Sequence, residues 1–264
     1  MPFLSLTTWS LHRVLGPLYW TEWDENAQEQ ITVVEQQPDI HSLLELPKIL
    51  TKKGYTAVEV GHFHFPSTDE AYLNSLRRSC EEAGVRFYTL LADYGDITSP
   101  DPVRREKDME WIKRWIDVAS MVGAEHVRVI GGLAEPDNAS ALELAVQQFN
   151  ELSSYAKKRD VKLLTENFRS LTSTVENCLF LLDQTDIGFT CDFGNYKGAD
   201  KLAFLKEIIP KSSSIHAKAI TNPDGSLDES ELSRCLDIME EVNYEGAITL
   251  VYDGPGDMWK VFIM

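Results

Sequence analysis

One pattern repeats along this sequence and restricts its fold more than any other feature. A stretch with helical periodicity ends at a glycine or a polar turn residue, and a short run rich in β-branched residues follows at once. Gly54, Gly84 and Gly123 stand at three of these junctions. Glycine suits the end of a helix because it adopts a left-handed backbone conformation at little steric cost. The alternation of helices and strands predicts an α/β fold built on a parallel sheet.

The pattern predicts eight strands. They are expected at residues 3–8, 55–60, 85–90, 126–130, 161–165, 187–191, 212–219 and 247–251. Between them lie amphipathic stretches with apolar residues three and four apart, which predict helices. Eight such units fit closure into a (β/α)₈ TIM barrel, and no G-x-G-x-x-G motif of an open dinucleotide-binding sheet follows any strand. Because 264 residues is the length of one such barrel, we expect a single domain over residues 1–264.

Residues 13–38 depart from this rhythm. The segment is rich in Trp, Glu and Gln and separates the first strand from its helix by far more than an ordinary connection. It predicts a lid over the site, a packing arm or part of an interface between subunits.

Charge and cysteine spacing exclude several classes of protein. With 42 acidic and 25 basic residues the net charge is −17, which opposes binding to nucleic acids and to anionic membranes. No apolar run approaches the roughly 18 residues of a membrane span. The four cysteines are far apart and form no C-x-x-C pair. Without a secretory signal at the start, a cytoplasmic location is the expectation.

Polar residues at the carboxyl ends of the predicted strands define a candidate site, because the active sites of (β/α)₈ barrels lie there. Glu166 ends the fifth strand, Asp192 ends the sixth and His216 lies in the seventh. Two carboxylates and an imidazole on three successive strands suit Mn²⁺, Mg²⁺, Co²⁺ or Zn²⁺. The residues that we expect to bind substrate are His12, Glu59, His62, His64, Arg169 and Asn195, with Lys218 as a further catalytic candidate.

These residues resemble those of the xylose isomerase-like barrels, which include sugar phosphate isomerases and epimerases, tagatose/psicose 3-epimerases and type IV AP endonucleases. The resemblance runs nearly the whole chain. It is carried by TWSLH at residues 8–12, GYTAVEV at 54–60, EN at 166–167, DFGN at 192–195, HAK at 216–218 and YEGAITL at 244–250. It implies that Glu166, Asp192 and His216 are metal ligands, and it is compatible with a homo-oligomer.

The eighth strand departs from the family pattern. Similar proteins usually read Leu-Glu-Tyr there, and that Glu is the fourth metal ligand and often the second base. This chain reads Leu250-Val251-Tyr252, and Val251 can neither bind a metal nor move a proton. Asp253 is two residues further on, has the same side-chain direction in an extended strand, and is a candidate replacement ligand.

The resemblance implies a metal-dependent isomerase or epimerase that acts on a sugar or sugar phosphate. In such a reaction a base, for which Glu166 is the candidate, removes the proton beside a carbonyl and an enediolate forms. A lyase or dehydratase would share this first step. The alternatives are a sugar-binding barrel that lost its chemistry with the strand-eight Glu, and an AP endonuclease, which six histidines and the negative charge disfavour.

Overall fold

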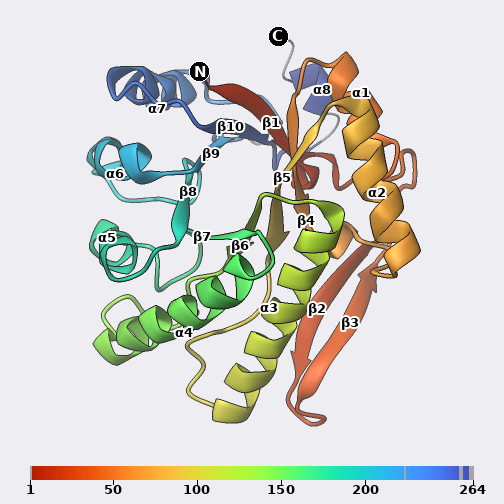
Figure 1. Cartoon of the computed structure of the whole chain (residues 1–264). Helices are drawn as coiled ribbons and strands as arrows, with labels where there is room; N and C mark the ends of the chain where they lie inside the picture. Colours follow the sequence, from red (N-terminus) through yellow and green to blue (C-terminus); the bar gives the residue numbers. More distant parts are fainter. Residues whose placement is uncertain (1, 223, 256–257, 262–264) are drawn as a thin grey trace.

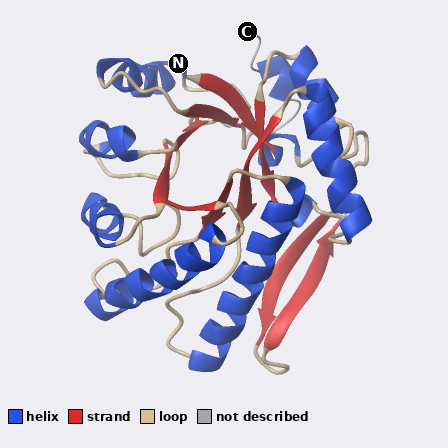
Figure 2. Cartoon of the chain, viewed as in Figure 1, coloured by secondary structure: helices blue, strands red, loops and turns tan. Residues whose placement is uncertain are grey.

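The protein is described here by a computed structural model that covers residues 2–222, 224–255 and 258–261. Eight parallel strands close into a barrel in the order β1-β10-β9-β8-β7-β6-β5-β4, with helices around the outside (Figures 1 and 2). The strands are β1 (Phe3–Thr7), β4 (Ala57–Gly61), β5 (Arg86–Ala92), β6 (His126–Val129), β7 (Lys162–Glu166), β8 (Gly188–Asp192), β9 (Ser214–Lys218) and β10 (Ala247–Val251). The prediction of a (β/α)₈ barrel is confirmed.

An α-helix lies between each pair of successive barrel strands, and α8 follows the last strand. The helices are α1 (Leu46–Lys52), α2 (Glu70–Ala83), α3 (Pro102–Val122), α4 (Ala139–Lys157), α5 (Val175–Gln184), α6 (Lys201–Ile208), α7 (Glu229–Glu241) and α8 (Met258–Val261), with short 3-10 turns η1 (Thr8–Leu11), η2 (His62–His64) and η3 (Ile209–Lys211). Within the residues described, no helix is long and apolar enough to cross a membrane.

Side-chain caps at the start and glycines at the end set the bounds of α2 and α3. Asp69 and Asp101 accept hydrogen bonds from backbone amides in the first turns of α2 and α3. Gly84 and Gly123 end the same helices with φ of +65° and +74°. Both glycines stand where the sequence pattern placed them, so the helix–glycine–strand pattern reflects real helix ends.

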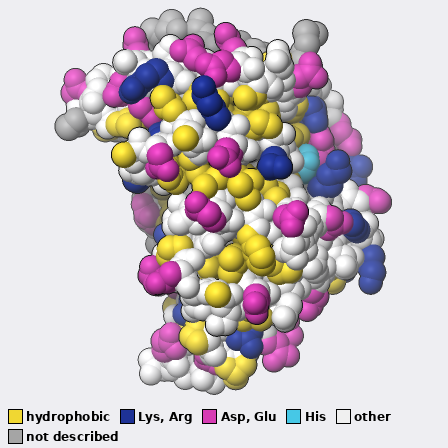
Figure 3. All heavy atoms as spheres, turned by 90° about the vertical axis from the view of Figure 1, so that its left-hand side faces the viewer, with side chains coloured by type: hydrophobic (Ala, Val, Ile, Leu, Met, Phe, Trp, Pro, Cys, Tyr) yellow, Lys and Arg dark blue, Asp and Glu magenta, His cyan; other side chains and the backbone are white. Residues whose placement is uncertain are grey.

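Burial explains why the strands are so apolar. The main core packs strand residues such as Leu90 and Val127 against helix residues such as Leu76 and Ile116, all completely buried. Outside this core, Asp and Glu side chains are spread over the face formed by the helices from α4 to α7 (Figure 3). The negative charge of the sequence is therefore distributed over a broad surface.

Residues 18–35 form an antiparallel hairpin of β2 (Leu18–Asp24) and β3 (Glu29–Glu35) that stands beside the barrel next to α3 (Figure 1). Its β2 strand contacts η2, and its β3 strand contacts α3. The Trp20 ring packs on Phe63, 4.4 Å between centroids, and Gln30 Nε2 donates to Asp108 Oδ1 at 3.0 Å. The long segment is thus an ordered element anchored on the barrel.

Candidate metal centre

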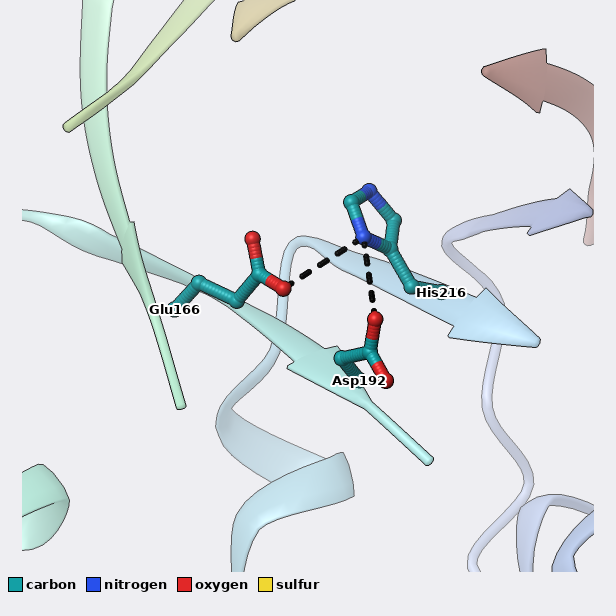
Figure 4. Close-up of side chains that lie close together, drawn as sticks. All are labelled: Glu166, Asp192 and His216. Carbon is teal, nitrogen blue, oxygen red and sulfur yellow. Dashed lines mark ion pairs between the residues drawn. The ribbon is translucent and has the colours of Figure 1, made fainter. Parts of the chain in front are cut away.

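Three acid and imidazole side chains meet at the carboxyl ends of neighbouring strands. Glu166 ends β7, Asp192 ends β8, and His216 lies in β9 directly opposite Asp192 in the strand register. Figure 4 shows the three pointing toward one another. His216 Nδ1 is 3.6 Å from both Glu166 Oε1 and Asp192 Oδ2, and one ligand atom of each residue lies within 4.8 Å of the others. All three side chains are buried.

Local hydrogen bonds fix the direction of the Asp192 carboxylate. Its Oδ1 atom accepts from the backbone amides of Gly194 at 2.6 Å and Asn195 at 2.9 Å. Asn167 holds the backbone of the same residue, with its side chain bonded to both the amide and the carbonyl of Asp192. Because Oδ1 is occupied in this way, Oδ2 is the oxygen that faces His216.

Glu59 lies on the opposite side of His216 from this cluster. Its Oε2 is 2.8 Å from His216 Nε2, and its Oε1 accepts from Thr249 Oγ1 at 2.8 Å. Burial raises the pKa of the Glu59 carboxyl, but His216 outweighs that effect, and the pKa lies below its ordinary value. Burial lowers the pKa of His216, but Glu166 and Glu59 raise it more, so that it lies well above its ordinary value. The field at this imidazole strongly favours positive charge.

The donor set fits a divalent cation. Two carboxylate oxygens and one imidazole nitrogen are ligands that Mg²⁺, Mn²⁺, Co²⁺ and Zn²⁺ accept in different degrees. When His216 Nε2–H donates a hydrogen bond to Glu59 Oε2, the lone pair of Nδ1 faces the side where Glu166 and Asp192 lie. A carboxylate behind a histidine is the usual outer partner of a metal-bound imidazole. The same negative field that attracts a proton to His216 would also attract a cation.

Arg128, from β6, is a buried residue of the site that the sequence prediction missed. Its Nε atom is 2.9 Å from Glu166 Oε2, and its Nη2 atom forms an ion pair with Asp93. Its side chain is only 4% exposed. The sequence contained one signal for Arg128, which is its position inside the apolar run 126–130. A guanidinium in a buried strand is rarely unpaired, so this position predicts acidic partners nearby.

A cavity of about 630 Å³ opens beside these residues, a size typical of small-molecule sites. Its wall includes Glu166, Asp192 and His216. The predicted residues that also line it are Arg169, Asn195, Lys218 and Asp253, together with Val251. Trp20, Thr21 and Glu22 of the hairpin form part of the wall. The segment interpreted as a lid or packing arm therefore contributes directly to the cavity.

A model of the xylose isomerase-like TIM barrel family matches residues 47–260. The chain belongs to this family. No curated protein matches it in sequence. Among solved structures, the probable 3-DHS dehydratase AsbF from Bacillus anthracis superimposes with a TM-score of 0.69 at 16% identity, covering 99% of this chain and 96% of that one.

Two further structures share the fold. A D-psicose 3-epimerase in the presence of D-fructose has a TM-score of 0.66 at 14% identity, covering 98% of this chain and 90% of that chain. A xylose isomerase-like TIM barrel protein from Mycobacterium smegmatis in complex with magnesium has a TM-score of 0.62 at 16% identity, covering 80% and 82%. At these identities the likeness shows the common xylose isomerase-like fold.

Four residues expected to bind substrate in this xylose isomerase-like barrel do not line the cavity. Glu59 is completely buried behind His216, as described above. His12 stacks on Trp9, with 4.0 Å between ring centroids, and Trp9 itself lines the cavity. His62 and His64 are buried in η2, where Nδ1 of His62 accepts from the Asp93 amide and Nδ1 of His64 lies 2.9 Å from Thr8 Oγ1. The structure thus places all four outside the cavity wall, and Glu59, His12 and His62 contact residues that line it.

Asp253 faces the cavity but stands apart from the three-residue cluster. Its Oδ1 accepts from Trp9 Nε1 at 3.0 Å, and its Oδ2 is 3.3 Å from Lys218 Nζ. Burial lowers the pKa of Lys218, but Asp192 and Asp253 raise it more, so the pKa is above its ordinary value and the side chain remains charged. In this arrangement Asp253 is a partner of Lys218, and the role of fourth ligand stays a prediction.

Proposed function

We propose that this chain is a metal-dependent isomerase or epimerase of a small polyhydroxylated carbonyl compound, a sugar or a sugar derivative. The observation that carries the proposal is the position of Glu166, Asp192 and His216 together in the wall of a ligand-sized cavity. The fold neighbours support the class: one is an epimerase studied with D-fructose, and another holds magnesium.

The residues would hold the cation, move the proton or bind substrate oxygens, and Glu166 would take the first two of these roles. Glu166, Asp192 and His216 would hold the cation. A bound divalent cation would polarise the substrate carbonyl and make the adjacent C–H bond more acidic. Glu166 would then take that proton, while Arg128 and Asn195, each 2.9 Å from one of its oxygens, fix the carboxylate in place. Lys218, kept protonated by Asp192 and Asp253, would donate hydrogen bonds to substrate oxygens.

Val251 makes isomerisation the simpler reaction for this site. Transfer of a proton between adjacent carbons needs one base on one face of the enediolate. Epimerisation by two bases also needs an acid on the opposite face. Val251 ends β10, where similar proteins usually carry the Glu that serves as second base, and it lines the cavity. Its apolar side chain also favours a second candidate, a sugar-binding barrel without catalysis.

Metal analysis of the purified protein tests the proposal. Elemental analysis before and after chelation is made on the wild type, on Glu166→Gln and on His216→Ala, with Asp253→Asn as the variant outside the cluster. We expect about one cation per chain in the wild type and in Asp253→Asn, and loss of the cation in the other two variants. Loss in Asp253→Asn as well would make Asp253 the fourth ligand.

An isomerase screen on the metal-loaded protein then separates the two candidates. Exchange of a substrate C–H proton with deuterated water, abolished in Glu166→Gln, is the expected result. No metal after adding it back would contradict the proposal. Metal and sugar binding without exchange would favour the non-catalytic barrel.

A further inference from the structure

Four basic side chains line the cavity of a protein whose net charge is −17. Three of them have carboxylate partners. Lys218 pairs with Asp253, and Arg104 pairs with the buried Asp108. Arg128 pairs with both Asp93 and Glu166. Their charges are compensated within the protein. Two features point toward a ligand: in the described part of the chain Arg169 has no carboxylate partner, and Arg128 keeps a buried donor atom without an acceptor.

Arg169 is exposed at the cavity wall and has no carboxylate within ion-pair distance among the residues that the structure describes. Its φ of +74° lies in the left-handed region, which costs a residue with a side chain about 1–2 kcal/mol. Its guanidinium carbon lies 4.4 Å from the centre of the Phe168 ring. A free cation is thus held against the wall by an unfavourable backbone conformation.

Arg128 approaches the same ring from inside the barrel. Its guanidinium carbon lies 5.5 Å from the centre of the Phe168 ring. Its Nη1 atom is buried and has no hydrogen-bond partner in the described part of the chain. A buried donor left without an acceptor costs about 1–3 kcal/mol. Since Arg128 lines the cavity, an acceptor on a ligand can satisfy it.

We propose that the substrate carries a carboxylate that binds to Arg169 and Arg128 beside Phe168, so that the substrate class is a sugar acid. This inference rests on the proposed function and adds that the sugar substrate carries a negative charge. The planar fork of a guanidinium matches a carboxylate through two parallel hydrogen bonds. A phosphate dianion fits less well, because Asp93 and Glu166 lie next to Arg128 and only Arg169 is uncompensated.

Titration calorimetry with matched sugars tests the inference. The probes are D-glucuronate and D-galacturonate, the neutral hexoses D-glucose and D-galactose, and the 6-phosphates of both hexoses. The full chain is titrated with and without added Mn²⁺. In the wild type we expect the uronates to bind about tenfold or more tightly than the hexoses and the phosphates, the effect of a charge-assisted hydrogen-bond pair.

The variants identify the residue responsible. Arg169→Gln should remove the preference for uronates, because its neutral amide cannot form a charge-assisted pair with a carboxylate. The thermal unfolding midpoint of the variant checks that it is folded. Arg78→Gln, an exposed arginine of α2 away from the cavity, is the matched control and should bind as the wild type does. Arg128→Gln is not the primary variant, because it would leave Asp93 and Glu166 without their cation.

Three results would overturn the inference: no uronate binding by the wild type, preference for phosphates or neutral hexoses, or a uronate preference that persists in Arg169→Gln. The test is independent of the metal analysis. A uronate preference without metal binding would contradict the proposed function alone, and metal binding without a uronate preference would contradict the carboxylate inference alone.

Discussion

Glu59 Oε2 lies 2.8 Å from His216 Nε2, and this contact determines which nitrogen of the imidazole faces the cavity. Thr249 Oγ1 holds the other Glu59 oxygen, and the carboxylate is completely inaccessible to solvent. Glu59 therefore acts on the candidate metal centre through His216, as a positioning residue behind a ligand.

Glu59→Gln should weaken binding of Mn²⁺ about 10- to 100-fold, the usual cost of losing such an outer partner. The amide keeps the size of the side chain but removes the charge that stabilises a polarised His216. Competition with a chelating dye measures the affinity. Glu82→Gln, which removes an exposed carboxylate from α2, is the control and should leave the affinity unchanged. Equal affinities for Glu59→Gln and the wild type would mean that Glu59 serves only packing.

Val251→Glu should tighten Mn²⁺ binding by about tenfold or more, because Val251 lines the cavity and a carboxylate there adds a charged oxygen ligand. Val251→Gln, of the same size and without the charge, should have a much smaller effect. Calorimetric titration of both variants measures the difference. If both variants bind Mn²⁺ like the wild type, the side chain at position 251 of β10 does not reach the cation. Turnover measured on Val251→Glu then reports function: a rise indicates a site that lost its second base, and a fall indicates one adapted to Val251.

The stability of the protein should fall in weak acid because two histidines are buried in the neutral form. Burial lowers the pKa of His62 to about 4, although Asp93 opposes it, and lowers the pKa of His64 to about 3. Their stabilising effect is complete above the unfolded value of 6.5 and is lost as the pH falls toward these lower values. Each histidine should then remove about 1.4 kcal/mol of the unfolding free energy per pH unit below 6.5.

Urea unfolding at several pH values between neutrality and mild acid measures this slope. His64→Gln keeps a hydrogen-bond partner for Thr8 and removes one titrating group, so its unfolding free energy should fall less steeply as the pH falls than that of the wild type. A slope that is unchanged in His64→Gln would show that other groups control acid stability.

The order of the strands and the convergence of Glu166, Asp192 and His216 could be predicted from the sequence because both depend on local signals. Gly84 and Gly123 mark helix ends directly, and Glu166 and Asp192 follow apolar strand runs. Parallel strands in a closed barrel then bring these ends together. The prediction needed the fold class and no knowledge of individual side-chain contacts.

The remaining parts depend on contacts between distant residues. Glu59 and His216 are 157 positions apart in the sequence. A sequence pattern cannot reveal that the Glu59 carboxylate lies behind His216 instead of facing the cavity. The partners of Arg128 come from two other strand ends, and only the folded barrel brings them to it. The hairpin at residues 18–35 was not predicted as two strands, although β3 contains the β-branched run at residues 31–34. The repeat that marked the barrel strands is a helix followed by a strand, and within the described residues no α-helix precedes either strand of the hairpin.

The backbone of Arg169 offers a test of whether its conformation serves binding. Arg169→Gly should not lower the unfolding free energy, because glycine adopts a φ of +74° freely, and this gain of about 1–2 kcal/mol offsets its larger entropy in the unfolded chain. Arg78→Gly, within α2, should instead lose about 1 kcal/mol, the cost of glycine in a helix. Chemical denaturation measures both variants. If Arg169→Gly is as stable as the wild type and no longer binds uronates preferentially, the left-handed conformation is retained for the ligand. If Arg169→Gly is destabilised as much as Arg78→Gly, the arginine is needed for the fold, and its conformation gives no support to a binding role.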